Sequence, residues 1–376
     1  MKISILAPDL SDNSTGRADL LARLLASRWA VEVVGPRFGS ELWRPSREGD
    51  VTHRAVAARR YPGFVSDAGR LADLADGDLL VAVKPRPSSF GVALLARRRR
   101  PRPLLLDIDD WELGFFYRAG FWGRVGRALN LADPNGLTWM WLAERSLGRA
   151  DAVTVASRFL EQRFGGALVP HVRDTEAWNP ERFPREEARR RLGLTGEKVV
   201  MFLGTPRAHK GVDDLVAAVA TLTPPVRLLL VGTEPASPAG RRWSARSFVT
   251  ALGEVAFADV PRYLAAADAV AVPQRDTADT LGQVPAKLFD AMALARPIVS
   301  TTVSMIPEIL DGCGVLVPPG DVTALASALR RVLERPDEAR ALGRRARERC
   351  EARFSFRAAR TVLFPMVERL LGGVGR

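Results

Sequence analysis

The sequence predicts an α/β protein with two doubly wound, Rossmann-like domains in tandem, each built on a parallel β-sheet. In the first part of the 376-residue chain, short apolar segments such as residues 2–8 and 104–108 alternate with segments whose apolar residues recur at helical spacing. A polar stretch with three prolines, residues 169–193, interrupts this alternation, and the alternation resumes at residue 198. Strands that alternate with helices favour parallel sheets covered by helices on both faces.

Four segments are expected along the chain. Residues 1–170 form the first domain, residues 171–190 a linker, residues 191–352 the second domain and residues 353–376 a C-terminal helix. Ligands of open α/β sheets bind beyond the carboxyl ends of the strands. We therefore expect the chemistry in a cleft between the two domains.

Composition limits the class of protein. The chain contains only two cysteines, Cys313 and Cys350, which cannot form a disulfide framework and favour a reducing cytoplasm. Neither a signal peptide nor a run of about 18 apolar residues is evident, so we expect a cytoplasmic protein. Two cysteines and three scattered histidines do not make a transition-metal cluster.

The chain is strongly basic, with a net charge of +12. Such a charge predicts attraction to nucleic acid, to anionic membrane lipid or to a phosphorylated substrate. The densest basic run, Arg97–Pro103, is equally consistent with a solvated loop. No nucleic-acid-binding motif accompanies this run, so we expect no nucleic-acid partner.

The stretch FLGTPRAHKG, residues 202–211, gathers positive charge in the turn after an apolar strand. Gly204 and Thr205 end the strand, and Arg207 and Lys210 follow. These cations predict an anion site, although both could instead be loop charges in water. The sequence therefore points to a phosphate-bearing ligand at this turn.

A second stretch, VPAKLFDAMALARP, begins a helix near Pro285, a residue that suits the first turn because it lacks an N–H. The N–H groups around Gln283 and Val284 then lie at a helix N-terminus, where anions are favoured. Together with the basic turn they would hold a diphosphate. Asp290, further along, could accept hydrogen bonds from a pair of sugar hydroxyls, or could pair with Lys287 one turn earlier.

Four stretches appear in one order over residues 199–335: GTPRAHKGVDDLVAAV, AAADAVAVPQ, VPAKLFDAMALARPIVSTTVSMIPEIL and GVLVPPGDVTALASALRRVL. As a set they resemble the retaining glycosyltransferases of family 4, which have the GT-B fold of two facing Rossmann-like domains. The resemblance implies a nucleoside-diphosphate-sugar donor, no tightly bound cofactor and no metal. It also implies an acceptor-binding first domain, and a C-terminal helix that crosses back onto that domain.

The resemblance assigns roles in the second domain. Lys210 would bind the donor diphosphate with help from Arg207, because the position of the family's usual arginine holds Thr205 here. Two acidic positions of the family correspond to Gly282 and Asp290, of which Asp290 would contact the nucleotide ribose. The residues implied in donor diphosphate or sugar binding are Gly204, Thr205, Gly282, Gln283 and Val284. With a glycine at position 282, the carboxylate that touches the donor sugar is absent there, and Asp276, Asp279 or Gln283 could replace it.

The first domain resembles the family less closely. Gly16 lies where a glycine-containing loop approaches the sugar and acceptor, and residues 83–89 lack the family's histidine but contain Lys84. The sequence DIDDWE, residues 107–112, follows a strand and could suggest a metal site. GT-B enzymes generally work without a metal, so we interpret Asp109 as an acceptor-side carboxylate.

The acceptor itself is not identified by the sequence. Residues 111–141 interleave aromatic and arginine side chains, including Tyr117 and Arg118, as in segments that lie at a lipid interface. We therefore expect peripheral contact with an anionic membrane through residues 97–141 and a lipid or lipid-linked acceptor. The alternatives are packing of residues 111–141 against the C-terminal helix, a soluble small-molecule acceptor, and a nucleotide-sugar-binding protein without transferase activity.

Overall fold

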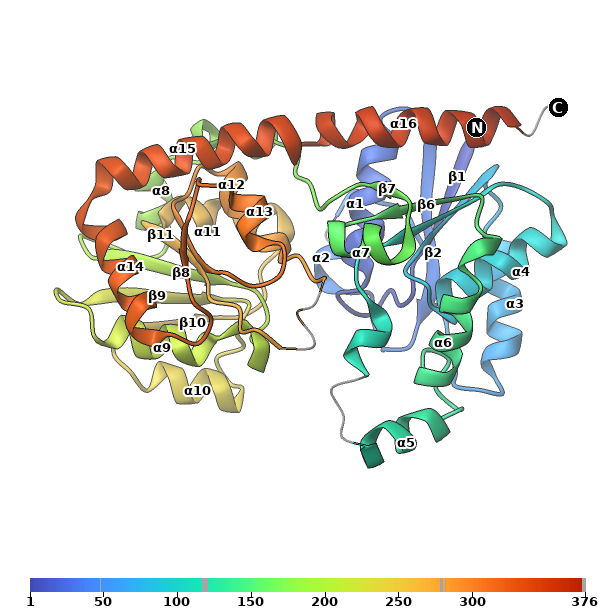
Figure 1. The fold of residues 1–376 in the computed structure, drawn as a ribbon, viewed down its shortest axis with the longest axis horizontal. Coiled ribbons are helices and arrows are strands. Elements are labelled where there is room, and N and C mark those ends of the chain that lie inside the picture. The colour runs from blue at the N-terminus through green and yellow to red at the C-terminus, as the bar shows by residue number, and fades with distance from the viewer. Residues whose placement is uncertain (48, 117–120, 278–279, 281, 374–376) are drawn as a thin grey trace. The chain divides into compact units, whose positions relative to one another are not determined.

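The computed structural model describes residues 1–47, 49–116, 121–277, 280 and 282–373, which fold into two compact α/β units (Figure 1). Unit 1 comprises Met1–Pro170, residues 282 and 283, and the chain from Ala359 onward. Unit 2 comprises His171–Thr280 and Val284–Ala358. The expected fold class, two Rossmann-like domains with parallel sheets, is confirmed.

The described residues of unit 1 form a seven-stranded parallel sheet in the order β3-β2-β1-β4-β5-β6-β7. Its central strands are continuous apolar runs buried on both faces, as parallel sheets covered by helices require. The strands are β1 (Lys2–Leu6), β2 (Ala30–Arg37), β3 (His53–Ala57), β4 (Leu79–Val83), β5 (Leu104–Ile108), β6 (Ala152–Val155) and β7 (Ala167–Leu168). The helices are α1 (Thr15–Ala26), α2 (Arg44–Arg47), α3 (Phe64–Leu74), α4 (Val92–Arg99), α5 (Phe121–Leu129), α6 (Leu137–Arg145) and α7 (Arg158–Phe164).

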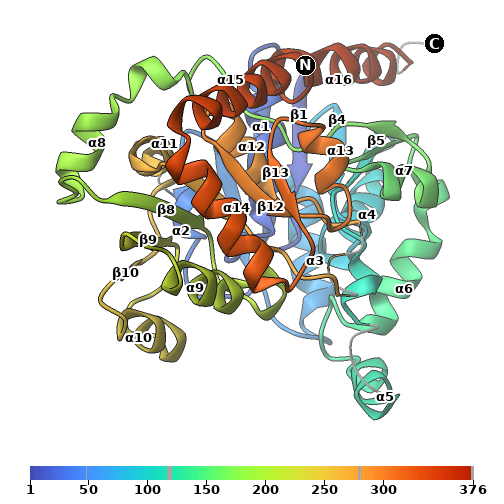
Figure 2. The same ribbon diagram turned by 60° about the vertical axis from the view of Figure 1, so that its left-hand side comes forward.

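The described residues of unit 2 form a six-stranded parallel sheet in the order β10-β9-β8-β11-β12-β13. Helices α9, α10 and α14 pack on one face of this sheet, and α8, α11, α12 and α15 on the other (Figure 2). The strands are β8 (Lys198–Leu203), β9 (Val226–Val231), β10 (Val249–Leu252), β11 (Ala269–Val272), β12 (Ile298–Thr301) and β13 (Val315–Val317). The helices are α8 (Arg185–Arg191), α9 (Val212–Ala220), α10 (Pro238–Ser244), α11 (Val260–Ala266), α12 (Ala286–Ala293), α13 (Ile306–Leu310), α14 (Val322–Glu334) and α15 (Pro336–Arg353).

Both sheets reverse their strand order at one point, between β1 and β4 in unit 1 and between β8 and β11 in unit 2. In open α/β sheets such a switch point opens a crevice at the carboxyl ends of the two strands, where ligands bind. In unit 2 this places the turn after β8 and the segment between β11 and α12 next to each other. These are the two stretches that the sequence identifies as an anion site.

A buried ion pair ties the switch point of unit 1 together. Arg17 on α1 donates two hydrogen bonds of 2.8 Å to the carboxylate of Asp107 on β5, and both side chains are shielded from solvent. Arg17 also donates to the carbonyl oxygens of Val169 and Pro170 at 2.7 and 3.0 Å. The first aspartate of DIDDWE therefore has a structural role, because it anchors α1 and the chain after β7 to the sheet.

The C-terminal helix α16 (Phe356–Gly372) belongs to unit 1 from Ala359 onward. It packs on the end of α1, where the rings of Phe364 and Trp29 meet edge to face with centroids 5.0 Å apart. The stretch expected to be a linker, residues 171–190, lies in unit 2 and includes most of α8, whose Ala188 is part of the core. None of the helices in the described part of the chain has the length and apolar content that a membrane-crossing helix requires.

Candidate functional site

The basic turn after β8 is shaped by two glycines in the left-handed region. Gly204 has φ 116° and Gly211 has φ 63°. A Cβ at Gly211 would lie 1.9 Å from the carbonyl oxygen of Pro273, the residue after β11. The turn therefore lies directly against the end of the neighbouring strand, where no side chain would fit.

Lys210 and Lys287 come together at this turn from different elements. Lys210 donates a hydrogen bond of 2.6 Å from Nζ to the carbonyl oxygen of Thr205 and is hydrogen-bonded to Lys287. Lys287 lies in the first turn of α12, and its side-chain end rests on Gly204. A Cβ at Gly204 would lie 2.3 Å from Cε and 2.4 Å from Nζ of Lys287. The sequence predicts Lys210 but not Lys287 as part of this site.

The positive charges of this cluster repel one another. Burial, together with the charges of Lys287 and Arg207, lowers the pKa of Lys210 to about 6. Burial also lowers the pKa of Lys287, and the nearby Arg207 and Arg173 add to this effect, whereas Asp290 opposes it. The cluster Arg207–Lys210–Lys287 is therefore an electropositive site that an anion would stabilise.

Asp290 forms an ion pair with a different residue from the one that its spacing along the helix suggests. Its carboxylate, which is 5% exposed, accepts a hydrogen bond from Nε of Arg173, and not from Lys287 one turn earlier. Arg173 is held in turn by the carbonyl oxygen of Val172 at 2.7 Å. The ion pair fixes the orientation of the Asp290 carboxylate, and contact with a ribose stays a prediction.

Gly282 occupies a position that excludes a larger residue. Its φ is 73°, and a Cβ would lie 2.2 Å from Cδ1 of Phe159. Its carbonyl oxygen accepts a hydrogen bond of 3.1 Å from Ser157. A glutamate at this position would require both the backbone and Phe159 to move.

The remaining donor-side residues flank α12. Val284 is buried, Gln283 is partly exposed, and Pro285 is the N-cap, so that the helix itself begins at Ala286. Asp276 is exposed, and Asp279 lies outside the described residues. The expected helix N-terminus is thus present one residue later than the sequence suggests.

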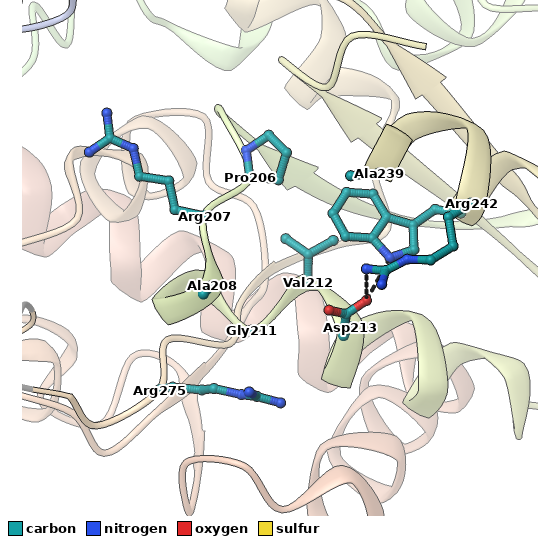
Figure 3. Close-up of a pocket in the computed structure, with 10 residues that line it drawn as sticks. Pro206, Arg207, Ala208, Gly211, Val212, Asp213, Ala239, Arg242 and Arg275 are labelled. Atoms are coloured by element: carbon teal, nitrogen blue, oxygen red, sulfur yellow. Dashed lines mark hydrogen bonds and ion pairs between the residues drawn. The ribbon is translucent and has the colours of Figure 1, made fainter. Parts of the chain in front are cut away.

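A small pocket of about 190 Å³ adjoins the basic turn (Figure 3). Arg242 is paired with Asp213 at 2.7 Å, and Arg275 with Asp214. Figure 3 shows Arg207 extending away from the Arg242–Asp213 pair. Ligand pockets usually measure roughly 300–1,000 Å³, so this space is too small for a nucleotide, and two of the three arginines that line it are already paired with aspartates.

The acceptor-side candidates of unit 1 lie at the carboxyl ends of β1, β4 and β5. Gly16 is in the first turn of α1 and not in a loop. Lys84 is 3% exposed, and its ammonium lies 2.9 Å from Asp109, 2.7 Å from Asp110 and 2.9 Å from Glu112. Burial disfavours the ammonium, but the three carboxylates outweigh it and raise the pKa of Lys84 well above its usual value.

The position that a cation would take among these carboxylates is thus occupied by Lys84. Within the described ranges, no group of three or more His, Cys, Asp or Glu side chains is arranged to hold a metal ion. Asp109 is 6% exposed, so its contact with an acceptor would require rearrangement of the Lys84 cluster.

The arginine run of residues 97–102 is largely engaged within unit 1. Arg97 pairs with Asp151 at 2.8 Å, Arg99 pairs with Asp73, and Arg102 is buried against backbone carbonyls. These contacts favour a structural role for the run over a free basic patch.

The aromatic residues of the segment 111–141 have several different surroundings. Trp111 packs near Phe159, and Trp139 packs near Tyr61, with ring centroids 6.0 and 5.0 Å apart. Trp141 is 43% exposed. Tyr117 and Arg118, which the membrane interpretation includes, lie outside the described residues. These ring contacts join the segment to the core of unit 1, whereas α16 places its Phe364 against Trp29.

The two units have the GT-B class of fold, and comparison with known proteins shows what part of the chain is similar to. Residues 197–335 match the family model for glycosyl transferases group 1. The chain therefore carries a group 1 glycosyltransferase domain, which confirms the resemblance seen in the sequence.

Curated relatives are similar over different lengths. Alpha-D-kanosaminyltransferase of Streptomyces kanamyceticus is 30% identical over 196 residues, which cover 50% of this chain and 48% of the relative. D-inositol 3-phosphate glycosyltransferase of Saccharomonospora viridis is 34% identical over 203 residues, covering 49% and 45%. The chain thus spans about half the length of these two relatives. A GDP-mannose-dependent alpha-(1-6)-phosphatidylinositol monomannoside mannosyltransferase of Mycobacterium tuberculosis is 26% identical over 363 residues, covering 88% and 87%.

Solved structures agree on the fold. Sucrose-phosphate synthase from Thermosynechococcus elongatus has a TM-score of 0.75 at 21% identity and covers 99% of this chain and 100% of its own. Anabaena Alr3699/HepE in complex with UDP-glucose has a TM-score of 0.73 at 18% identity, covering 98% and 100%.

The lowered pKa of Lys210 predicts a pH-dependent stability. Between about pH 6 and 10.5, the unfolded chain holds a proton on Lys210 that the folded chain has lost. The free energy of unfolding of the wild type should therefore rise with pH across this window, relative to Lys210→Met. Below pH 6 both states are protonated, and the difference should be constant. Urea unfolding at a series of pH values measures this, and parallel curves for the two proteins would contradict it.

Proposed function

We propose that this protein is a retaining glycosyltransferase that moves a sugar from a nucleoside-diphosphate-sugar donor to an acceptor hydroxyl. The observation that carries the proposal is the convergence of Lys210, Lys287 and Arg207 at the switch point of the group 1 domain. Paired cations and a helix N-terminus suit a diphosphate. Of the similar proteins named above, one was solved in complex with UDP-glucose and one is GDP-mannose-dependent, so these are the donors to test first.

In the proposed reaction, the bond between the anomeric carbon and the diphosphate oxygen breaks while the acceptor oxygen bonds to the same face of the sugar. The acceptor proton passes to the departing phosphate oxygen, so that the protein supplies neither a nucleophile nor a base. Negative charge grows on the diphosphate as the bond breaks. Lys210 and Arg207 lower the barrier by stabilising this charge.

Asp290 is the candidate for the nucleotide ribose, and its ion pair with Arg173 supports this role because it holds the carboxylate in one orientation. On the acceptor side, the proposal assigns Lys84 and Asp109 to a polar site at the switch point of unit 1. The relatives named above include a mannosyltransferase named for phosphatidylinositol monomannoside and a glycosyltransferase named for D-inositol 3-phosphate. A lipid-linked acceptor and a soluble one are therefore both represented among them.

Exposed apolar side chains in unit 1 favour the lipid acceptor. Leu129 is 74% exposed at the end of α5, and Leu131, Trp141 and Leu142 are 50%, 43% and 44% exposed nearby in the chain. Arg145 lies over the Trp141 ring at 3.9 Å. Apolar and aromatic side chains beside arginine suit the interface of an anionic membrane. We propose a cytoplasmic protein that contacts this membrane peripherally.

Loss of the Lys210 ammonium is expected to remove donor binding. A ligand at about 100 times its Kd stabilises the folded state by about 2.7 kcal/mol, so UDP, GDP or their sugars should raise the melting temperature of the wild type. Lys210→Ala should lose this shift and, with a working acceptor, about 10²–10³ in rate. Lys198→Ala, at the opposite end of β8, is the matched control.

No stabilisation of the wild type by any nucleotide would contradict the proposed donor site. Stabilisation without hydrolysis or transfer of any donor sugar would instead favour a nucleotide-sugar-binding protein that lacks transferase activity.

The membrane contact is expected to depend on the exposed apolar side chains. The wild type should sediment with phosphatidylglycerol vesicles and less with phosphatidylcholine vesicles, because the chain carries a net charge of +12. Leu129→Ser combined with Trp141→Ser should reduce sedimentation while leaving nucleotide-induced stabilisation unchanged. Equal sedimentation of the wild type and the double variant would favour a soluble acceptor.

A further inference from the structure

Lys287 is an unusual residue for its place in the fold. It occupies the second position of α12, within the first turn. The helix dipole favours acidic side chains at this end and disfavours cations. Burial and the like charges of Arg207 and Arg173 add to this cost, and the carboxylate of Asp290 offsets only part of it. Lys287 therefore does not stabilise the empty protein, which points to a function that requires a positive charge.

A glycine at position 204 leaves room for the lysine side chain. The end of the Lys287 side chain lies against Gly204, where even a methyl group would overlap Cε and Nζ. A compact ammonium fits this space, whereas a planar guanidinium with five N–H groups is larger.

The composition of the chain strengthens this reading. Only five of the 55 basic residues are lysines, and two of these five meet at this site. A chain that uses arginine so widely has nevertheless placed lysine at both positions. The choice of lysine at both positions points to lysine chemistry, that of a small ammonium group whose proton can be lost and regained.

We infer that Lys287 is a second ligand of the donor diphosphate, and that binding of a nucleoside diphosphate is coupled to the uptake of one proton by the Lys210–Lys287 pair. The inference rests on the proposed function and deepens it. Lys287 would supply the positive charge that is missing where Thr205 stands in the position of the family's usual arginine. The inference also makes the protonation of the pair part of donor recognition.

The proton coupling follows from the hydrogen bonds of the empty site. A neutral Lys210 amine donates one hydrogen bond to the carbonyl oxygen of Thr205 and accepts one from the Lys287 ammonium. A neutral amine also presents a lone pair, which phosphate oxygens repel, whereas two ammonium groups present only N–H donors to them. An arriving diphosphate supplies the negative charge that the pair lacks, so Lys210 takes one proton from solvent and no covalent bond changes.

The other charged groups around the pair do not supply this negative charge. Arg207 and Arg173 face the pair and add positive charge. Asp290 is the opposing carboxylate, and its charge is shared with Arg173 through their ion pair. A diphosphate is thus the charge that balances the described cluster.

Calorimetric titration of UDP and of GDP at pH 8 tests the inference. Buffers of different ionisation enthalpy report the number of protons taken up, and phosphate buffer is avoided because it competes for the site. At pH 8 Lys210, with a pKa of about 6, is largely neutral in the empty protein. The wild type should take up close to one proton per site, and Lys210→Met should take up none.

Lys287→Met should bind the same nucleotide about 10–100-fold more weakly, as expected for the loss of one hydrogen bond from a charged group. Lys198→Met should bind as the wild type does. Uridine and guanosine, which lack phosphate, should produce no proton uptake. Circular dichroism melts establish that each variant is folded, and Lys287→Met should be at least as stable as the wild type because it removes an opposed cation.

Two results would overturn the inference while leaving the proposed function intact. One is unchanged nucleotide affinity in a folded Lys287→Met variant. The other is a binding enthalpy of the wild type that does not depend on the buffer. If the wild type binds neither UDP nor GDP, the proposed function fails, and the inference fails with it.

Discussion

The donor side of unit 2 depends on three basic side chains, Lys210, Lys287 and Arg207, that are held together at the end of β8 without enough negative charge beside them. Two glycines leave room for these basic side chains to lie this close together. Gly204 admits the end of Lys287, and Gly211 allows the turn to lie against Pro273. The unbalanced positive charge of the empty site is unfavourable, and an anionic ligand would balance it. The proposed binding and catalysis both follow from this constraint.

The two units use the same topology with different electrostatics. In unit 2, the switch point gathers cations in excess. In unit 1, the switch point holds the ion pair of Arg17 and Asp107, whose charges cancel, beside a lysine surrounded by three carboxylates. The carboxylates of the second arrangement are already paired with Lys84, so an acceptor that binds them has to compete with this lysine. This contrast is why the structure supports a donor site more strongly than an acceptor site.

Much of this architecture could be predicted from the sequence, because central parallel strands are continuous apolar runs and the basic turn is local. Lys210 and the start of α12 follow from such local patterns. The edge strand β3 (HRAVA) carries a weaker apolar pattern, which does not distinguish it from a loop. The partners of Asp290 and Lys287 could not be predicted, because Arg173 and Gly204 are far from them in the chain. One signal was available for Lys287: a lysine in the first turn of a helix opposes the dipole.

The most direct test of the account is a crystal structure of the protein with UDP or GDP, whichever binds. The account predicts phosphate oxygens within hydrogen-bonding distance of Nζ of both Lys210 and Lys287, with the bond from Lys210 to the carbonyl oxygen of Thr205 weakened or replaced. Phosphates bound elsewhere, or bound without either lysine, would contradict it.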